Sequence, residues 1–572
     1  MVPRIKYLHL LSYALLCLLS ILPWTRSELF TAIAEVEHLL ETHQRIIDNL
    51  DHYIKAEENR ILILKKHLNH YKKEQEKAME DIPNYLGNPI NAFTLIKRLT
   101  TDLDAIESSI KSGTEKFIFE YIKNVTSFQN EVKYPSEEDL SGAAHALIRL
   151  QETYRLNAKD LADGILNGIV YSLDGCMHAD TFFSTPMTTS DCFELAKALY
   201  SDKDYKNALP WLLETLRKFK EKDEIYQFDE VDILEYIGFS HYLLGNVRDA
   251  LKWTKKLLEI DPNHSRAKGN IPYFEKMIKE EEAKIKKRQR GETLEDENTT
   301  NSSEDDNYQK DHMRYESLCR GEMELPPDYS KTLFCRYMTE NHPFLKLAPI
   351  KMEYVYRQPD VIVFHEVLSD SEIEFIKAKS LPRFKRAVVH DPKTGNLVPA
   401  QYRISKSAWL RDEESPLIAA VSRRVADFTG LSMYSAEDLQ VVNYGIGGHY
   451  APHYDFALKS EHAFDGFEGN RIATVLFYMS EVAQGGATVF MRLGISVFPK
   501  KGAALFWMNL HPSGAGDVST RHAACPVLRG SKWVCNKWIH QGGQEFLKPC
   551  NLNYQDEEYL HKIPKAISKT SR

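Results

Sequence analysis

The chain has no excess of positive charge, few cysteines and only one long apolar run. Among its 572 residues, 73 lysines and arginines are outnumbered by 81 aspartates and glutamates, which gives a net charge of −8 and argues against nucleic acid as a general partner. Only residues 8–23 form a long apolar run, and a membrane span needs roughly 20 such residues. None of the eight cysteines has the spacing of zinc ligands. We therefore expect a soluble mature protein without a structural zinc site.

The amino-terminal segment has the features of a secretory signal peptide. Basic Arg4 and Lys6 precede the apolar run, and small Ser27 is followed by acidic Glu28, so we expect residues 1–27 to be removed. In the secretory pathway, Asn-x-Ser/Thr sequons become candidates for glycosylation. The four sequons are at Asn124, Asn263, Asn298 and Asn301.

Loss of Cys17 with the signal peptide leaves an odd number of cysteines. An odd count in an oxidising compartment means at least one free thiol or an intermolecular bond. Spacing alone does not decide how they pair. The remaining cysteines are Cys176, Cys192, Cys319, Cys335, Cys525, Cys535 and Cys550.

A heptad pattern runs from Ile33 to Tyr71. Apolar residues recur in alternating steps of three and four, interrupted only by His43 and Glu57, which predicts a helix with a continuous apolar seam. We expect a helical coiled-coil dimerisation domain at residues 28–150. A second copy of the chain is the favoured partner for the seam, and the chain's own helices near 95–110 are the alternative.

Residues 157–280 have the pattern of tetratricopeptide repeats. The segment 234–245, Ala250 and Asp261-Pro262 match the repeat spacing, and residues 195–219 form a weaker copy. Stacked repeats form extended binding surfaces, and aromatic grooves accept polyproline II segments. Five aromatic residues are candidates to line such a groove for a substrate peptide, with packing between the helices as the alternative. They are Tyr200, Tyr205, Tyr236, Phe239 and Tyr242.

After residue 280 the composition changes twice. The stretch 281–312 is charged and rich in Ser and Asn, which is typical of a flexible linker. Farther along, short β-rich runs are separated by glycine turns, and this alternation predicts a β-barrel or jelly roll. The runs are 439–444, 450–456, 471–479, 487–491, 495–499 and 503–508.

A His-x-Asp motif lies in this β-rich region. Residues i and i+2 of a strand point the same way, so His453 and Asp455 can bind one metal ion, and His522 from another strand can complete the set. Two imidazoles and one carboxylate hold a ferrous ion on one face and leave the other face open. Lys532 can bind an acidic cosubstrate beside the metal. The pattern predicts an oxygenase.

The chain contains a second His-x-Asp motif, His178-Ala179-Asp180. No strand alternation surrounds it, and no His-x9-Lys pattern follows it. We expect this copy to be a loop without a metal.

Four segments resemble the catalytic domain of the 2-oxoglutarate- and Fe(II)-dependent prolyl 4-hydroxylases, namely 400–410, 443–456, 485–490 and 519–538. The similarity continues through the amino-terminal half, so nearly the whole chain resembles the alpha subunits of collagen prolyl 4-hydroxylases. The resemblance implies a multidomain α + β protein. Its parts would be an N-terminal coiled-coil dimerisation region, an α-helical tetratricopeptide-like peptide-substrate-binding domain, a connector at 313–345 and a double-stranded β-helix (jelly-roll) catalytic domain at 346–550. The tail at 551–572 has no assigned role.

The resemblance also implies roles in the catalytic site. His453, Asp455 and His522 would bind Fe(II), and Lys532 would pair with the distal carboxylate of 2-oxoglutarate. Related lysyl hydroxylases, and the prolyl hydroxylases that act on transcription factors, carry arginine at the position of this lysine. The lysine therefore favours a collagen-type substrate.

Other residues near the implied iron site are assigned in the same way. Tyr450 and Thr474 would donate hydrogen bonds to the same carboxylate. His449 stands where relatives have glutamine, and its imidazole could compete for the metal. Arg521 and Trp538 are candidates for shaping the proline pocket.

The implied reaction is 4-hydroxylation of proline in X-Pro-Gly repeats of procollagen, with O2 and 2-oxoglutarate consumed and succinate and CO2 formed. Ascorbate would be a further cofactor. The implied setting is the endoplasmic reticulum lumen. Because residues 569–572 are not a lumenal retention signal, a partner would hold the chain there, and the resemblance names protein disulfide isomerase as the beta subunit of a heterotetramer with two alpha and two beta subunits. The resemblance also pairs Cys319 with Cys335 and Cys525 with Cys550.

Two other functions fit the same motifs. A different 2-oxoglutarate hydroxylase, acting on lysine or on a non-collagen proline, would share the metal ligands. A noncatalytic peptide-binding scaffold would use only the repeats and the coiled coil.

Overall fold

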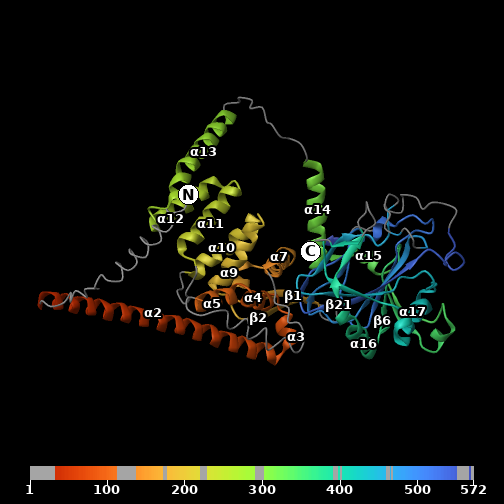
Figure 1. Cartoon of the computed structure of the whole chain (residues 1–572). Helices are drawn as coiled ribbons and strands as arrows, with labels where there is room; N and C mark the ends of the chain where they lie inside the picture. Colours follow the sequence, from red (N-terminus) through yellow and green to blue (C-terminus); the bar gives the residue numbers. More distant parts are fainter. Residues whose placement is uncertain are drawn as a thin grey trace, which may run out of the picture. The chain divides into compact units, whose positions relative to one another are not determined.

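The structure is a computed structural model of the chain (Figure 1). It describes residues 33–111, 137–171, 177–219, 228–289, 302–390, 397–399, 402–458, 464, 468–550 and 566–568. The predicted signal peptide, Cys176 and the sequons Asn124, Asn298 and Asn301 lie outside these ranges. Two compact units are present, Met1–Glu74 and Gln75–Arg572. In the described ranges, no helix has the length and apolar character needed to cross a membrane.

Helix α2 spans Ile33–Glu80, which confirms the helix predicted from the heptad pattern. Three residues of the predicted seam, Ile54, Ile61 and Leu68, are 47, 46 and 53% exposed. Full burial of an aliphatic side chain is favourable by about 1.5–3 kcal/mol. These three seam residues therefore keep apolar surface that is exposed in the described part of the chain.

Short helices and one hairpin follow α2. They are α3 Ile82–Leu86, α4 Pro89–Leu99, α5 Thr101–Lys111, α7 Glu137–Tyr154, α8 Ala158–Ala162, β1 Ile165–Tyr171 and β2 Met177–Phe183. Helix α4 begins where the Asn88 side chain accepts the N–H of Ile90 and Pro89 takes the first helical position. The segment His178-Ala179-Asp180 lies in β2 and pairs with β1. The expectation of a loop is wrong there, because pairing in the hairpin outweighs weak intrinsic strand propensity.

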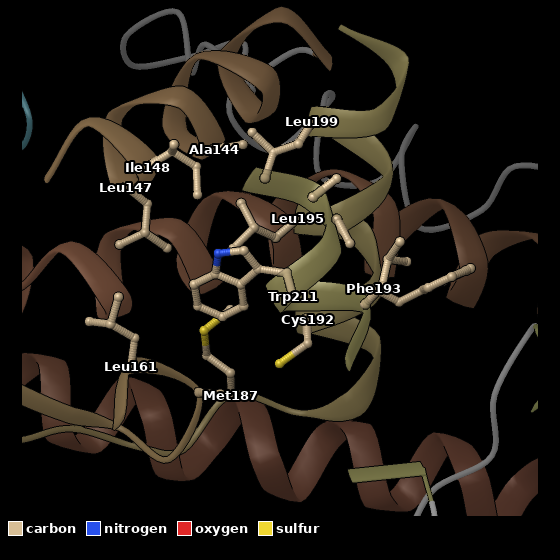
Figure 2. Packing of buried hydrophobic residues seen from close by; sticks show 14 of the residues in the cluster. Ala144, Leu147, Ile148, Leu161, Met187, Cys192, Phe193, Leu195, Leu199 and Trp211 are labelled. Carbon is tan, nitrogen blue, oxygen red and sulfur yellow. The ribbon is translucent and has the colours of Figure 1, made fainter. Parts of the chain in front are cut away.

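The described residues of the repeat region form paired helices, as predicted. They are α9 Thr189–Ser201, α10 Tyr205–Phe219, α11 Glu230–Leu243, α12 Val247–Ile260 and α13 Ser265–Gln289. Capping boxes at Thr188 and Asp229 start α9 and α11. The paired helices begin at Thr189 rather than at 157, because α8 and the hairpin occupy the intervening residues. Figure 2 shows the core, where Trp211 packs among residues of α7, α9 and the segment before α9.

The predicted flexible linker at 281–312 is helical at both ends. Helix α13 continues to Gln289, and α14 spans Ser302–Cys319. The Glu, Lys and Arg residues that make this stretch polar are also good helix formers. The prediction is wrong for these flanks, and residues 290–301 lie outside the described ranges.

Cys319 forms a disulfide with Cys525, with a Cα–Cα distance of 5.5 Å. The predicted pairs Cys319–Cys335 and Cys525–Cys550 are therefore wrong. The end of α14 packs against β16 and β19 in one apolar cluster that contains both bonded cysteines, and this long-range packing decides the pairing. Cys335 and Cys550 are exposed free thiols, whereas Cys192 and Cys535 are buried free thiols.

Two antiparallel sheets form the carboxy-terminal domain, in agreement with the expected double-stranded β-helix. The larger sheet has the order β4-β5-β6-β18-β14-β21-β12-β11-β7, and the smaller has the order β10-β13-β19-β16-β17. The strands of the larger sheet are β4 Cys335–Met338, β5 Ile350–Tyr356, β6 Val361–His365, β7 Lys385–Arg386, β11 Lys406–Leu410, β12 Leu439–Tyr444, β14 Arg471–Tyr478, β18 Ala504–Met508 and β21 Lys532–His540. Those of the smaller sheet are β10 Arg403–Ile404, β13 His449–His453, β16 Thr488–Phe490, β17 Ile495–Val497 and β19 His522–Ala524.

Two apolar layers hold this domain together. Val442 and Val534 of the larger sheet share a buried cluster with Phe490 and Ile495 of the smaller sheet. Helices α16 Asp370–Ser380 and α17 Pro416–Thr429 share a second cluster with the larger sheet. Through this first cluster, one face of the smaller sheet packs toward the larger sheet. Strands β13 and β19 belong to the smaller sheet. The short elements around the sheets are β3 Met323–Glu324, α15 Pro327–Ser330, β8 Val388–His390, β9 Leu397–Pro399, β15 Gln484–Gly485, β20 Val527–Arg529 and β22 Ile567–Ser568.

Candidate metal centre

The three predicted metal ligands lie together where β13 meets β19. His453 ends β13 and pairs with His522, which begins β19. One ligand atom from each of His453, Asp455 and His522 lies within 4.8 Å of the other two. In the part of the chain that the structure describes, this is the one group of three histidine, cysteine or acidic side chains with such spacing. The predicted convergence of the three ligand atoms is present. The expected strand over 450–456 is too long, because β13 ends at His453 and Asp455 lies in the bend that follows it.

Backbone carbonyls orient both imidazoles. Nδ1 of His453 lies 2.8 Å from the carbonyl oxygen of Ala451, and Nδ1 of His522 lies 3.0 Å from that of Thr520. With the protons on these Nδ1 atoms, each Nε2 keeps a free lone pair, and the two Nε2 atoms lie 3.6 and 3.7 Å from oxygens of Asp455. Burial and the neighbouring His453 lower the pKa of His522 to about 4. Its imidazole is therefore neutral near pH 7, as metal binding requires.

Asp455 is 6% exposed and is held by two donors. Its Oδ2 accepts hydrogen bonds from Oγ1 of Thr474 at 2.8 Å and from Nε1 of Trp538 at 3.0 Å. Nδ2 of Asn509 donates in turn to Oγ1 of Thr474 at 2.9 Å. Thr474 thus lies behind a metal ligand, and the prediction that it donates to the cosubstrate is wrong. Trp538 likewise orients Asp455.

Charges around Asp455 keep it ionised. Burial alone would raise its pKa, but His522, His453 and Arg471 together lower the pKa far below its usual range. Arg471 also lies 3.8 Å from the ring centre of Trp538. The carboxylate is therefore ionised and available as a metal ligand near pH 7.

A buried ionic cluster behind the metal ligands was not predicted. Glu437 accepts hydrogen bonds from Arg471 at 2.5 and 2.9 Å and lies 2.9 Å from Nε2 of His540. Burial would raise the pKa of Glu437, but Arg471 and His540 lower it to about 2. The sequence signal that could have indicated this cluster is the position of Arg471 and His540 at the ends of the apolar strands β14 and β21. The cluster fixes Arg471 over Trp538 and so supports Asp455.

Lys532 opens β21 and is 1% exposed. Its Nζ has no hydrogen-bond partner among the described residues and lies 5.5 and 5.9 Å from the ring centres of Tyr444 and Tyr478. Burial lowers the pKa of Lys532 to about 7. Because an unpaired buried ammonium is costly, this position favours an entering anion.

A hydroxyl that the sequence analysis did not select lies at the same end of the site. Thr488 of β16 and Tyr450 of β13 both pair with Ala524 of β19, from its two sides. The hydroxyl of Tyr478 donates to Oγ1 of Thr488 at 2.9 Å, and the Tyr478 ring also neighbours Lys532. The segment containing Thr488 contributed to the family resemblance, yet only the strand pairing reveals that this residue faces the site.

Tyr450 lies against His453 of the metal centre, and its hydrogen bond to the cosubstrate stays a prediction. Its ring stacks on that of His453, with centroids 3.5 Å apart and an interplanar angle of 18°. Burial raises the pKa of Tyr450 to about 12, so the phenol keeps its proton. Residues three positions apart in a regular strand point to opposite faces. The register shift between Tyr450 and His453 lets both rings lie on the same face.

The possible competing ligand His449 does not join the metal cluster. Its side chain is buried, and burial together with the nearby Arg149 lowers its pKa to about 3. Arg521, a candidate for the proline pocket, lies 3.0 Å from Asp311 of α14 in an ion pair. His449 is therefore not one of the three ligands, and the Arg521 side chain, although next to His522 in sequence, is paired with Asp311.

The five predicted groove aromatics form two neighbouring sets on the repeat helices. Tyr200 contacts Tyr205 and Tyr236, with ring centroids 5.2 and 4.8 Å apart. Phe239 contacts Tyr242 at 5.6 Å, and the Tyr242 hydroxyl lies 3.2 Å from that of Tyr273. Tyr273, which was not predicted, is 49% exposed on α13.

Three family profiles match successive parts of the chain. They are the prolyl 4-hydroxylase alpha-subunit N-terminal region over 32–168, the prolyl 4-hydroxylase peptide-substrate-binding domain over 189–280, and the 2OG-Fe(II) oxygenase superfamily over 439–540. The second match begins where α9 begins.

Similar proteins cover almost the full length. Prolyl 4-hydroxylase subunit alpha-2 of Caenorhabditis elegans is 44% identical over 555 residues, which cover 95% of this chain and 97% of the relative. Prolyl 4-hydroxylase subunit alpha-1 of Gallus gallus is 44% identical over 535 residues, covering 92% and 99%. Among solved structures, a viral collagen prolyl hydroxylase from Paramecium bursaria Chlorella virus-1 in complex with 2OG is 25% identical over 31% of this chain and 94% of that chain, with a TM-score of 0.26.

Proposed function

Because this chain belongs to the prolyl 4-hydroxylase alpha-subunit family, we propose that it hydroxylates C4 of proline in X-Pro-Gly repeats of procollagen, at a ferrous ion held by His453, Asp455 and His522. It is a 2-oxoglutarate-dependent enzyme. The observation that carries the residue assignment is the convergence of these three ligand atoms within 4.8 Å.

The donor set fits Fe(II). Two imidazole nitrogens and one carboxylate on one side of an ion leave the other side open, which suits non-haem iron oxygenases. The orienting carbonyls behind both imidazoles, and the donors behind Asp455, are the outer partners that metal ligands ordinarily need. Bound iron and 2-oxoglutarate supply the oxidation of the proline C–H bond by O2, with succinate and CO2 as the other products.

The residues of the chain bind and orient the cosubstrate. Lys532 pairs with its distal carboxylate, since Nζ is buried and has no partner among the described residues. Thr488 and Tyr450 supply hydroxyl groups at the same end of the site. Thr488 takes the role that the sequence analysis gave to Thr474.

Packing around the ligands limits their motion and the access of water. The ring of His522 contacts Trp507 at 4.7 Å and Phe490 at 5.7 Å between centroids. Both aromatic residues are fully buried. Ascorbate, which the family resemblance implies, would keep the iron in the ferrous state between turnovers.

The repeat helices bind the proline-rich chain away from the iron. Partly exposed aromatic rings on α9 to α13 offer stacking surfaces to a polyproline II segment. A substrate with many repeats that is held there has a raised effective concentration at the iron.

The proposal extends to assembly and location, which the family resemblance suggests. The exposed apolar seam of α2 is the surface for self-association. A protein disulfide isomerase beta subunit completes a heterotetramer in the endoplasmic reticulum lumen. Light scattering of the purified protein, alone and after addition of protein disulfide isomerase, tests both associations through the mass of the complex.

The experiment that tests the function compares peptide substrates. The full-length protein, with Fe(II), ascorbate and 2-oxoglutarate, is incubated with (Pro-Pro-Gly)n, with a lysine-containing collagen-like peptide, or with no peptide. Of the three conditions, we expect 2-oxoglutarate turnover and a hydroxylated product only in the one with (Pro-Pro-Gly)n. Turnover with the lysine peptide would favour a different hydroxylase, and peptide binding without any turnover would favour a scaffold.

A further inference from the structure

Helix α7 directly contacts two turns of the catalytic domain. The guanidinium of Arg149 donates to the carbonyl oxygen of Gly447 at 2.7 Å, and the hydroxyl of Tyr154 donates to that of Pro526 at 2.6 Å. The first turn leads from β12 into β13, and the second leads from β19 into β20. The turns also bond to each other, since the N–H of Gly447 donates to the carbonyl of Val527 at 2.8 Å. One helix therefore holds the turn that enters β13 and the turn that leaves β19.

Two glycines permit this close approach. Gly447 has a φ of +65°, and a Cβ there would lie 2.7 Å from Cβ of Ala146 in α7. Gly485 has a φ of +77°, and a Cβ there would lie 2.6 Å from the Tyr154 hydroxyl. Both positions need glycine for backbone conformation and for space. The fit between α7 and these turns leaves no room for a side chain.

The contact is also part of the apolar core. Leu528, which is 1% exposed, belongs to the same buried cluster as Leu147 and Ile148 of α7 and Leu195 of α9, and Ile446 packs against that cluster. Protein interiors are close-packed and resist displacement. The second turn is thus anchored inside the core of the helical region.

Tyr154 is connected to Lys532 through a short path. Its hydroxyl faces Gly485, and the next residue, Gly486, lies beside the stem of Lys532, where a Cβ on Gly486 would be 3.4 Å from Cδ of the lysine. Gly485 also pairs with Val527 of β20, and β20 leads into β21, which Lys532 opens. Since Nζ of Lys532 has no hydrogen-bond partner among the described residues, its position depends on this packing.

We propose that Tyr154 and Arg149 are positioning residues for the cosubstrate end of the active site. By holding the turns around Gly447, Gly485 and Pro526, they keep Lys532 at the separation from the metal that 2-oxoglutarate requires. This inference rests on the proposed function, which assigns 2-oxoglutarate to Lys532. It makes the amino-terminal helical region a structural part of the active site.

The variant Tyr154→Phe tests the proposal, because it removes one hydroxyl and keeps the buried ring. Calorimetry on the full-length protein loaded with Mn(II) measures the dissociation constant of 2-oxoglutarate. We expect it to rise about fivefold, the factor that corresponds to one ordinary hydrogen bond, while Mn(II) affinity is unchanged. In the activity assay, KM for 2-oxoglutarate rises by a similar factor and kcat is nearly unchanged.

Arg149→Met, which breaks the bond to Gly447, shifts the same constant in the same direction. The matched control is Arg155→Met. Arg155 is the next residue after α7, but its side chain is 67% exposed and pairs with Glu322 at 3.4 Å rather than with the turns. This control leaves the affinity for 2-oxoglutarate unchanged.

Three outcomes separate the possibilities. Unchanged affinity in Tyr154→Phe, with normal binding by the wild type, overturns the positioning role and leaves the proposed function intact. Equal losses of Mn(II) and 2-oxoglutarate affinity indicate general loosening of the domain and also overturn it. Failure of the Mn(II)-loaded wild type to bind 2-oxoglutarate refutes the proposed function itself.

Discussion

The metal centre and the aromatic sets of the repeat helices are built in opposite ways. Asp455 is buried and accepts two hydrogen bonds, and each metal-binding imidazole lies against a backbone carbonyl. In the repeats, by contrast, Phe239 and Tyr273 are 39 and 49% exposed, and the rings mainly contact one another. The first arrangement is preorganised for one geometry, whereas the second offers several similar contacts. We therefore expect all-or-none effects at the metal centre and graded effects in the repeats.

The largest effect is expected for Asp455→Ala. Loss of partners behind a metal ligand ordinarily costs about 10- to 100-fold, so loss of the ligand itself should lower hydroxylation by more than about 100-fold. Mass spectrometry of (Pro-Pro-Gly)n products measures the change, and peptide binding should be retained. Asp180→Ala alters the second His-x-Asp motif and should leave hydroxylation unchanged. Equal activity in both variants would contradict the assignment.

Lys532→Met is expected to rank second. Removing one member of a buried charge pair costs about 2–5 kcal/mol, so KM for 2-oxoglutarate should rise about 100-fold. Steady-state kinetics with varied 2-oxoglutarate checks this. The control is Lys537→Met on the same strand, since that buried lysine lies 3.7 Å from Asp412 and should affect KM little. A large effect in the control alone would show that the cosubstrate binds elsewhere.

In the repeats, Phe239→Ala should have a graded effect. Truncation of one partly exposed ring removes at most about 1.4 kcal/mol of contact with a peptide, so KM for a long proline-rich peptide should rise by about tenfold or less. The value of kcat and the KM for short peptides should not change, because the iron site is intact. The control is Phe183→Ala, at a 77% exposed ring on β2. A fall in kcat for Phe239→Ala would contradict the assignment of peptide binding to the repeats and of the reaction to the metal centre.

The last prediction concerns pH. Burial lowers the pKa of Lys532 to about 7, so its amine is mostly neutral above that pH in the ligand-free protein. A carboxylate pairs with the charged form and raises its pKa, so binding must take up a proton, and affinity falls about tenfold per pH unit above pH 7. Calorimetry near pH 8 in two buffers of different ionisation enthalpy measures the uptake. No uptake in the wild type, or equal uptake in Lys532→Met, would exclude this lysine as the source.

Ligand chemistry and the His-x-Asp spacing were sufficient to predict that His453, Asp455 and His522 converge, although Asp455 lies beyond the end of β13. The prediction for Thr474 failed because the partner of a threonine hydroxyl depends on which strand pairs with its own and on which side chains lie next to it. Thr474 pairs with Trp507 and bonds to Asp455, whereas Thr488 pairs with Ala524 and faces the site.

Helix α2 and the repeat helices were also predictable, because the periodic spacing of their apolar residues is a pattern within a short stretch of sequence. The disulfide between Cys319 and Cys525 and the contacts of α7 with the catalytic turns were not, because each joins residues far apart in sequence. Charge composition was also misleading, since it predicted a flexible linker over residues that belong to the end of α13 and the start of α14.

The most direct test of the central assignment is anomalous diffraction from crystals of the protein with Mn(II) and 2-oxoglutarate. The account predicts one strong peak bound by Nε2 of His453, a carboxylate oxygen of Asp455 and Nε2 of His522, with Nζ of Lys532 against the distal carboxylate of 2-oxoglutarate. A peak at any other set of side chains, or a cosubstrate that does not contact Lys532, would contradict it.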